Sequence, residues 1–193
     1  MMLSRSVFQN IVFILALSAL FCPKGVMAQD AAAAPKGKTI EVFGKSEMVV
    51  PTAFQPVPKR SRILDYEFKA TDKSNDQPAR VTMMASGGGI DANIKRWKGQ
   101  FTGGNEDAKK VENKKLGEVT LHLVDTNGNF TERMGGGPFA GGKMVQRRDY
   151  AMTGAILEYP DGKTYFVKMT GPNSVVQANR EEFVKMLETL SDK

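Results

Sequence analysis

Two short stretches decide the fold of this chain: Ile63 to Lys69, which reads ILDYEFK, and Arg80 to Ala85, which reads RVTMMA. In both stretches apolar side chains alternate with charged or polar ones. Such alternation places the apolar side chains on one face of a strand and the polar side chains on the other. The polar segment TDKSNDQP, at residues 71–78, joins the two stretches. Together they predict an antiparallel hairpin that is buried on one face.

Two further strand pairs follow the same rules. The first joins residues 110–116 to residues 118–125 around Gly117, and the second joins residues 145–159 to residues 163–170. The turn of the second pair is Pro-Asp-Gly, in which proline presets φ and glycine tolerates a positive φ. These pairs extend the expected antiparallel sheet. Residues 40–50 are expected to form an additional early strand.

A helix is expected between the hairpins. Ile90, Ile94 and Trp97 recur at helical spacing, and the opposite side is basic. We expect Asp91 to cap this helix and Trp97 to lie in the core. The preceding run of three glycines at 87–89 matches neither common phosphate-binding spacing, so it predicts a tight turn.

A second helix is expected near the C-terminus. Capping patterns leave two starts open, Ser174 and Asn179. In either case Phe183, Leu187 and Leu190 form an apolar stripe that would pack on the sheet. The fold class is therefore α+β: an antiparallel sheet with one short helix between hairpins and a C-terminal helix on the sheet.

The first residues resemble an export signal. Arg5 precedes an apolar run, IVFILALSALF at residues 11–21, and small residues end at Ala28. This layout predicts a signal peptide over residues 1–28, a flexible linker over 29–45 and a single domain over 46–193. The protein is then expected to be periplasmic or secreted. A lipid-carrying cysteine is normally preceded by small residues, but Cys22 is preceded by Leu20 and Phe21. Lipid attachment at Cys22 is therefore not favoured.

Composition argues against several functions. The chain has a formal net charge of +6, and its basic pairs are interleaved with acidic residues. A nucleic-acid surface needs a one-sided basic stripe, so we expect solvated faces and no nucleic-acid partner. The only cysteine lies in the signal region, which removes disulfides, thiol nucleophiles and thiolate-bound metals from the expected domain.

Candidate catalytic residues are few. His122 is the single histidine, no G-x-S-x-G motif is present, and Asp65 and Glu67 read as the exposed side of a strand. The segment DTNGN at 125–129 fails the calcium-loop pattern, and its Asn127-Gly128 pair predicts a hairpin turn. We therefore expect no catalytic residues, no cofactor and no bound metal.

One resemblance adds to this interpretation. GGGIDANIKRWKGQF at 87–101, SRILDYEF at 61–68 and YFVKMTGP at 165–172 together resemble a signature of uncharacterised exported bacterial proteins, several from planctomycetes. The similarity covers about Val49 to Leu190, although Phe54 replaces the usual tryptophan of the proline-rich segment. It implies a fold like that of PsbP and Mog proteins, which are non-catalytic binding or accessory proteins.

The expected function is an exported, non-catalytic binding or accessory domain whose partner is an unknown protein or envelope component. The sheet face or the glycine-rich segment MGGGPFAGG, at 134–142, would make the contact. The expected contact residues are Met134, Pro138, Phe139 and Met144. Two alternatives remain: a membrane-surface or lipid-associated envelope protein and, less favoured, a carboxylate-based enzyme.

Overall fold

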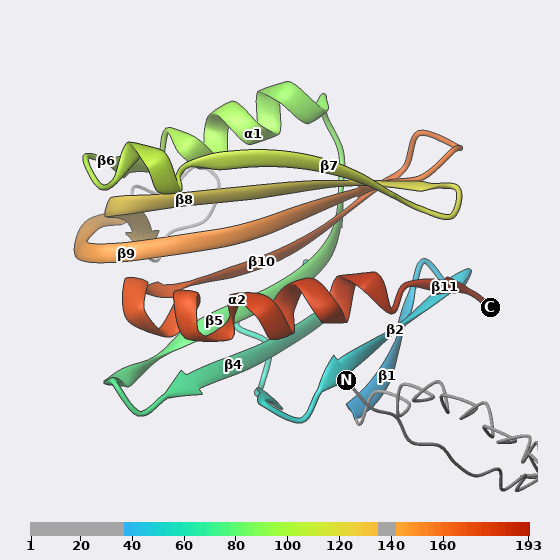
Figure 1. The fold of residues 1–193 in the computed structure, drawn as a ribbon, viewed down its shortest axis with the longest axis horizontal. Helices are drawn as coiled ribbons and strands as arrows, with labels where there is room; N and C mark the ends of the chain where they lie inside the picture. The colour runs from blue at the N-terminus through green and yellow to red at the C-terminus, as the bar shows by residue number, and fades with distance from the viewer. Residues whose placement is uncertain (1–36, 135–141) are drawn as a thin grey trace, which may run out of the picture. The chain divides into compact units, whose positions relative to one another are not determined.

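The computed structural model describes residues 37–134 and 142–193, all within one compact unit, Ala34–Lys193. The predicted signal peptide, Pro138 and Phe139 lie outside the described residues. The fold is α+β, as the sequence predicts: antiparallel sheets, one short helix between hairpins and a C-terminal helix packed on the main sheet (Figure 1).

The main sheet contains eight strands of the described residues, and every neighbouring pair is antiparallel. The first six strands in spatial order are β3 (Phe54–Pro56), β4 (Tyr66–Asp72), β5 (Asn75–Ser86), β10 (Thr164–Pro172), β9 (Lys143–Glu158) and β8 (Val119–Met134). The other edge of β8 pairs with two shorter strands, β6 (Phe101–Thr102) and β7 (Lys110–Leu116). A short 3-10 turn, η1 (Glu106–Ala108), separates β6 from β7.

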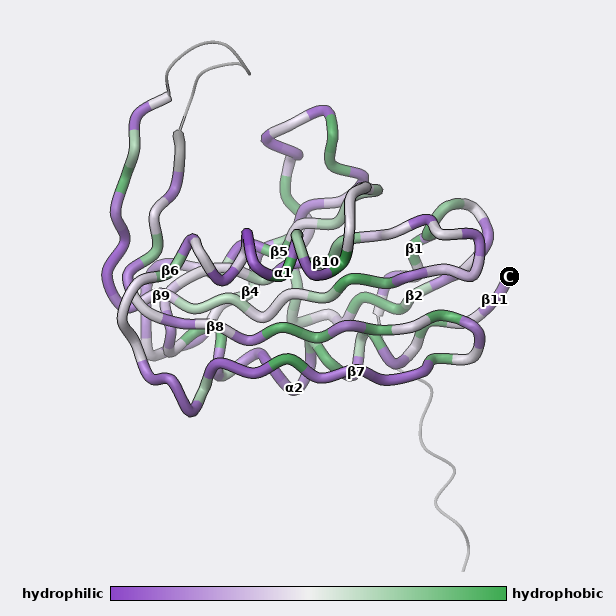
Figure 2. The backbone as a smooth tube through the Cα atoms, turned by 90° about the horizontal axis from the view of Figure 1, so that it is seen from above, coloured by the Kyte–Doolittle hydropathy of each residue, from purple (hydrophilic) through white to green (hydrophobic). Residues whose placement is uncertain are grey.

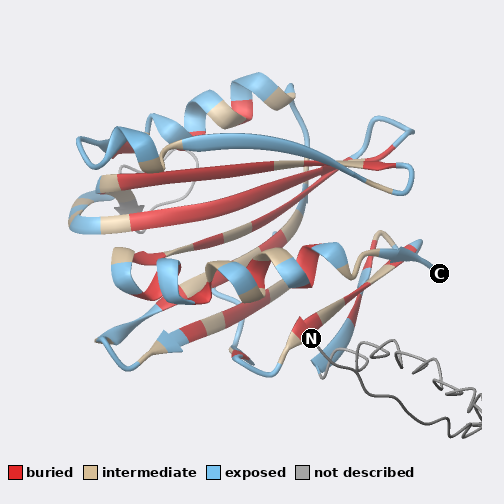
Figure 3. Ribbon diagram, in the orientation of Figure 1, coloured by how far each residue is buried: buried red, intermediate tan, exposed pale blue. Residues whose placement is uncertain are grey.

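Two helices cover opposite faces of this sheet. The C-terminal helix α2 (Asn173–Glu188) lies along one face, where Phe183 and Leu187 are fully buried among the inward side chains of β5, β8, β9 and β10. Figure 3 shows the buried strip of α2 turned toward the buried strands. The predicted apolar stripe on this helix is therefore correct. The helix begins at Asn173, directly after Pro172, so neither of the two predicted starts is correct.

The short helix α1 (Ile90–Lys98) packs on the other face through Trp97, which is 2 % exposed. Its indole contacts Phe166 edge-on, with ring centroids 5.0 Å apart. A Cβ on Gly154 of β9 would stand 2.8 Å from the indole Cζ3, so this position accepts the ring only because it is glycine. Trp97 is a core residue, as predicted.

The far ends of β8 and β9 extend beyond the other strands. Residues 143–147 pair only with β8, because β10 pairs with β9 no further than Tyr150. Figure 2 shows this two-stranded arm as largely hydrophilic. Met144 lies on it and is 55 % exposed.

The predicted linker over 29–45 is too long at its C-terminal end. Gly37–Val42 forms β1, which pairs with β2 (Ser46–Pro51), and β11 (Ser191–Asp192) completes a small second sheet. Ile40 and Val42 are buried in the α2-side core, so the folded domain includes residues before 46. The single early strand expected over 40–50 is instead a hairpin, with positive φ at Phe43 and Gly44.

Two local predictions are also wrong. Asn127-Gly128 is not a hairpin turn but lies at a bulge within β8, where a Cβ on Gly128 would stand 2.5 Å from the Thr102 carbonyl oxygen. Asp91 does not cap α1. The cap residue is Gly89, and the buried Asn93 amide donates to its carbonyl at 3.0 Å.

Candidate functional site

The short helix α1 leaves part of its face of the main sheet uncovered. Along β10, Val167 and Met169 point into the α2-side core, so the alternating Lys168 points to the opposite face. Along β5, Arg80 lies on that same face for the same reason. Since α1 covers only the part of this face around Trp97, the remaining side chains surround an open cavity.

This cavity, the basic hollow, has a volume of about 510 Å³. It is lined by Arg60, Gln77, Pro78, Arg80, Thr82, Gln100, Phe130, Glu132, Arg147, Tyr150, Lys168, Thr170 and Gly171. Four of the lining side chains are basic and one is acidic, which gives the lining a net charge of +3 when Lys168 is protonated. Such a field favours anions.

Lys168 lies at the centre of the sheet, with Thr82 of β5 on one side and Gly154 of β9 on the other. Its Nζ lies 4.9 Å from the centroid of the Trp97 ring, a cation–π contact. Among the described residues, its ammonium has no ion-pair or hydrogen-bond partner. Burial lowers the pKa of Lys168 to about 8, and repulsion from Arg96 and Arg80 contributes to the same shift.

Glu67 of β4 is the acidic residue closest to Lys168 in the strand register, but its carboxylate binds Arg80 and Arg60 instead. It lies two strands from Lys168, with Thr82 between them, a separation of about 9–10 Å along the sheet. Its Oε1 accepts from the Arg80 Nε at 2.7 Å, and its Oε2 accepts from the Arg60 backbone N–H at 2.7 Å. Glu67 thus leaves the charge of Lys168 uncompensated.

The carboxyl of Glu67 is fully buried, in contrast to the exposed strand side expected from the sequence. Burial acts to raise its pKa. The hydrogen bonds from the Arg80 side chain and the Arg60 backbone outweigh burial and hold the pKa below its ordinary value. Glu67 is therefore an ionised anchor for Arg80.

The opposite wall of the hollow is aromatic. Phe130 of β8 and Tyr150 of β9 are parallel within 5°, with ring centroids 6.2 Å apart. The Tyr150 hydroxyl donates to the Gln77 Oε1 at 3.1 Å. The Oε1 of Gln100 is buried and has no hydrogen-bond partner among the described residues. The hollow therefore combines cations, an aromatic wall and a neutral acceptor.

The predicted contact residues do not converge on this cavity. Met144 is exposed on the arm but is not a lining residue, Met134 lies at the end of β8, and Pro138 and Phe139 are outside the described residues. The importance of this segment for binding stays a prediction.

His122 lies elsewhere on the sheet. Its Nδ1 is 3.0 Å from the Asn113 Oδ1 and its Nε2 is 2.9 Å from the Glu158 Oε2. These two contacts engage both ring nitrogens across β7, β8 and β9. The histidine is therefore held as a cross-strand link.

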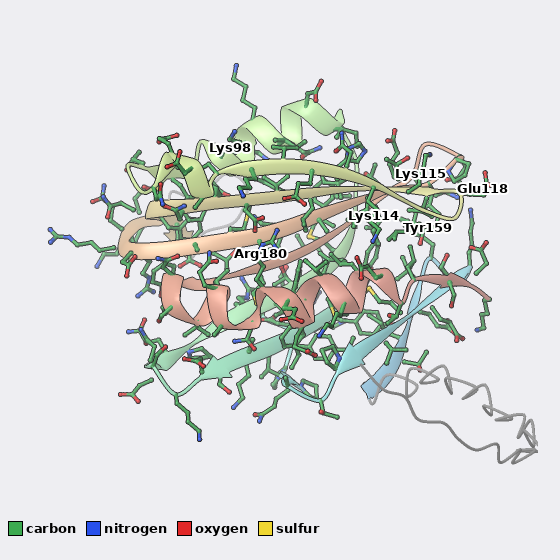
Figure 4. The ribbon with its side chains drawn as sticks, in the orientation of Figure 1. Lys98, Lys114, Lys115, Glu118, Tyr159 and Arg180 are labelled. Atoms are coloured by element: carbon green, nitrogen blue, oxygen red, sulfur yellow. The ribbon has the colours of Figure 1, made fainter. Side chains whose placement is uncertain are left out.

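A second ion pair holds α2 to the sheet. Arg180, labelled in Figure 4, donates to both carboxylate oxygens of Asp125, the shortest contact being 2.7 Å. Asp125 also accepts from the buried Thr153 hydroxyl at 2.8 Å. Because all three groups lie on the α2 side, this cluster belongs to the packing of the fold and not to the hollow.

The sequence contains one signal that could have indicated the hollow. Lys168 interrupts YFVKM, a run whose other residues are all buried. A charged residue inside such a strand is uncommon without a partner. Arg60 and Arg147 occur in basic pairs that predict only solvated faces.

No protein-family model and no curated protein matches this chain by sequence. Among solved structures, it is similar to cyanobacterial PsbP (CyanoP) from Synechocystis sp. PCC 6803. The alignment has a TM-score of 0.47 and 8 % identity, and covers 88 % of this chain and 100 % of that one. The expected similarity to PsbP is thus found, at a level that carries no information about function.

Among the described residues, neither α1 nor α2 combines the length and the hydrophobicity that crossing a bilayer requires.

Proposed function

We propose that this protein is an exported, non-catalytic accessory domain that binds an anionic ligand in the basic hollow. One observation carries the proposal: Lys168 is held in the floor of a concave site without a counter-ion among the described residues. An uncompensated, partly desolvated ammonium is costly. A bound anion would remove that cost.

The surrounding side chains support the same interpretation. Arg80 is fixed by Glu67, and Arg60 lies at the rim with its side chain 69 % exposed. Arginine guanidinium groups bind carboxylates and phosphates through paired hydrogen bonds. An anion entering the hollow would therefore meet a lysine on the floor and arginines around it.

Trp97 provides the direct test, because it is the only tryptophan of the chain and contacts Lys168. Titration with pyrophosphate should change its fluorescence in the unaltered protein. Lys168→Met should weaken binding at least tenfold, because one charge-assisted contact contributes about 1.5–3 kcal/mol. Lys98→Met is the matched control, since Lys98 is an exposed residue of α1 that does not line the hollow (Figure 4).

Two results would contradict anion binding at this site. One is the absence of saturable binding by pyrophosphate or citrate. The other is equal affinity in the Lys168→Met and Lys98→Met proteins, because binding would then reflect overall charge.

Export is tested separately. The intact mass of the protein purified from its own cell envelope should correspond to a chain that starts at Gln29. A mass that starts at Cys22 with acyl chains would favour the lipid-anchored alternative. A mass that includes residues 1–28 would contradict cleavage.

A further inference from the structure

We infer that the occupant of the basic hollow is a small organic oxyanion: a carboxylate or phosphoryl group held at Lys168 and Arg80, on a flat body that lies against Tyr150. This inference rests on the proposed function and adds the chemical class of the ligand. It is argued from the volume, the donors and the aromatic wall of the hollow.

The volume sets the size of the ligand. About 510 Å³ falls within the range of about 300–1,000 Å³ that is typical of small-molecule sites. A bare inorganic anion occupies only a few water volumes of about 30 Å³ each. Such an ion would leave most of the hollow filled with solvent, so a larger organic molecule fits better.

The hydrogen-bond donors of the hollow indicate which charged group the ligand carries. Lys168 projects from the central strand β10, and Arg80 projects from the adjacent strand β5. The Arg80 Nε is engaged by Glu67, and no hydrogen bond joins its two terminal nitrogens to another described residue. Those nitrogens form a fork that suits a carboxylate or a phosphoryl group. Lys168 and Arg80, on adjacent strands and the same face, therefore provide two donors for one oxyanion.

The aromatic wall of the hollow indicates that the rest of the ligand is a flat ring. Tyr150 is stacked on Phe130 and anchored by its hydrogen bond to Gln77, so its ring is held in place. Offset stacking of a second ring on such a face is favourable beyond the burial of apolar area alone. The unpartnered Gln100 Oε1 would accept from a hydroxyl or amine of the same ligand.

Calorimetry with simple probes tests this assignment. Phenyl phosphate and benzoate provide an oxyanion with a ring, inorganic phosphate and acetate provide the oxyanion alone, and vesicles of phosphatidylglycerol and phosphatidylcholine provide an anionic surface. In the unaltered protein, each aromatic probe should bind at least tenfold tighter than its ring-free counterpart. The stronger of the two aromatic probes then identifies the oxyanion as phosphoryl or carboxylate.

Two variants separate the ring from the charge. Tyr150→Leu should abolish most of the tenfold preference for each aromatic probe over its ring-free counterpart. Tyr150→Phe, which keeps the ring and loses the hydroxyl, should retain the preference. The comparison among probes in the unaltered protein needs no variant, so it remains decisive if Tyr150→Leu fails to fold.

Each negative outcome has a distinct meaning. Equal affinity for phenyl phosphate and inorganic phosphate would overturn the ligand class and leave anion binding intact. Binding to anionic vesicles without binding of any small probe would overturn the ligand class in favour of a membrane surface. The absence of binding by every probe, with Trp97 fluorescence unchanged, would overturn the proposed function as well.

Discussion

Replacing Lys168 with methionine should stabilise the folded protein at neutral pH. The methionine side chain preserves the apolar stem that packs beside Trp97, and the substitution removes the ammonium. The pKa of Lys168 is lowered from its ordinary value of 10.5 to about 8. At about 1.4 kcal/mol per pKa unit, this lowering corresponds to a cost of at most about 3.5 kcal/mol for keeping the charge in the fold.

Two effects reduce that figure. The Lys168 residue is only half-buried, so solvent screens part of the cost. The cation–π contact with Trp97 contributes about 0.5–2 kcal/mol in the opposite direction and is lost with the ammonium. The cost of the charge exceeds the lost contact, so we expect a net gain of about 1 kcal/mol in the free energy of unfolding at pH 7.

The pH dependence provides the stricter test. Between pH 8 and pH 10.5 the unfolded chain keeps a proton on Lys168 that the folded chain has released. The free energy of unfolding of the unaltered protein should therefore rise with pH across this window relative to Lys168→Met. The advantage of the variant should thus disappear as the pH rises.

Urea unfolding at pH 7, 8, 9 and 10, followed by Trp97 fluorescence, measures this difference. Lys98→Met should give the same pH dependence as the unaltered protein, because that side chain is exposed on α1. A difference between Lys168→Met and the unaltered protein that stays constant from pH 7 to pH 10 would refute the reasoning. A less stable Lys168→Met protein at pH 7 would refute it too.

Three further substitutions and one control test the packing of the main sheet and the ionisation of Glu67. Gly154→Ala should lower the free energy of unfolding by about 1–3 kcal/mol and shift the Trp97 emission, because the added methyl would stand 2.8 Å from the indole. An unshifted emission spectrum would contradict this packing. Gly128→Ala should cost about 3 kcal/mol, since φ is 134° and a backbone oxygen lies 2.5 Å from the new Cβ. Gly162→Ala is the control, because Gly162 has a φ of 77° but an added Cβ would meet no neighbouring atom. Thermal melting should show that this variant loses only about 1 kcal/mol of unfolding free energy. Glu67→Gln should cost about 1–3 kcal/mol at pH 7. Since the folded-state pKa of Glu67 lies below its ordinary 4.5, the loss measured by urea unfolding should shrink as the pH falls below 4.5, and a pH-independent loss would argue against an ionised Glu67.

Much of the fold was predictable because its signals are local. Alternation around Phe68 and Val81 predicted the first hairpin, and Pro160-Asp161-Gly162 predicted the turn between β9 and β10. The core position of Trp97 followed from helical spacing. Where the sequence misled, a distant contact decided the outcome. Gly128 has the local character of a turn residue, but the close approach of the β6 backbone places it in a bulge.

The candidate site was not predictable in this way. Its basic residues come from positions 60, 80, 147 and 168, which are separated by 20 residues or more. Only the register of β5, β10 and β9 brings Arg80, Lys168 and Tyr150 to one face. The predicted binding segment around Phe139 rests on composition, which carries no information about which strands become neighbours.

The fold class, the alternating strands and both helices follow from local signals in the chain, because backbone preferences and side-chain periodicity act within a few residues of each position. Long-range packing, in contrast, buries Glu67 as a partner of Arg80 and leaves Lys168 without a counter-ion among the described residues. That outcome depends on strand order and register, which set whether opposite charges meet at about 3 Å or stay two strands apart. The hollow left beside α1 is a product of the same long-range packing.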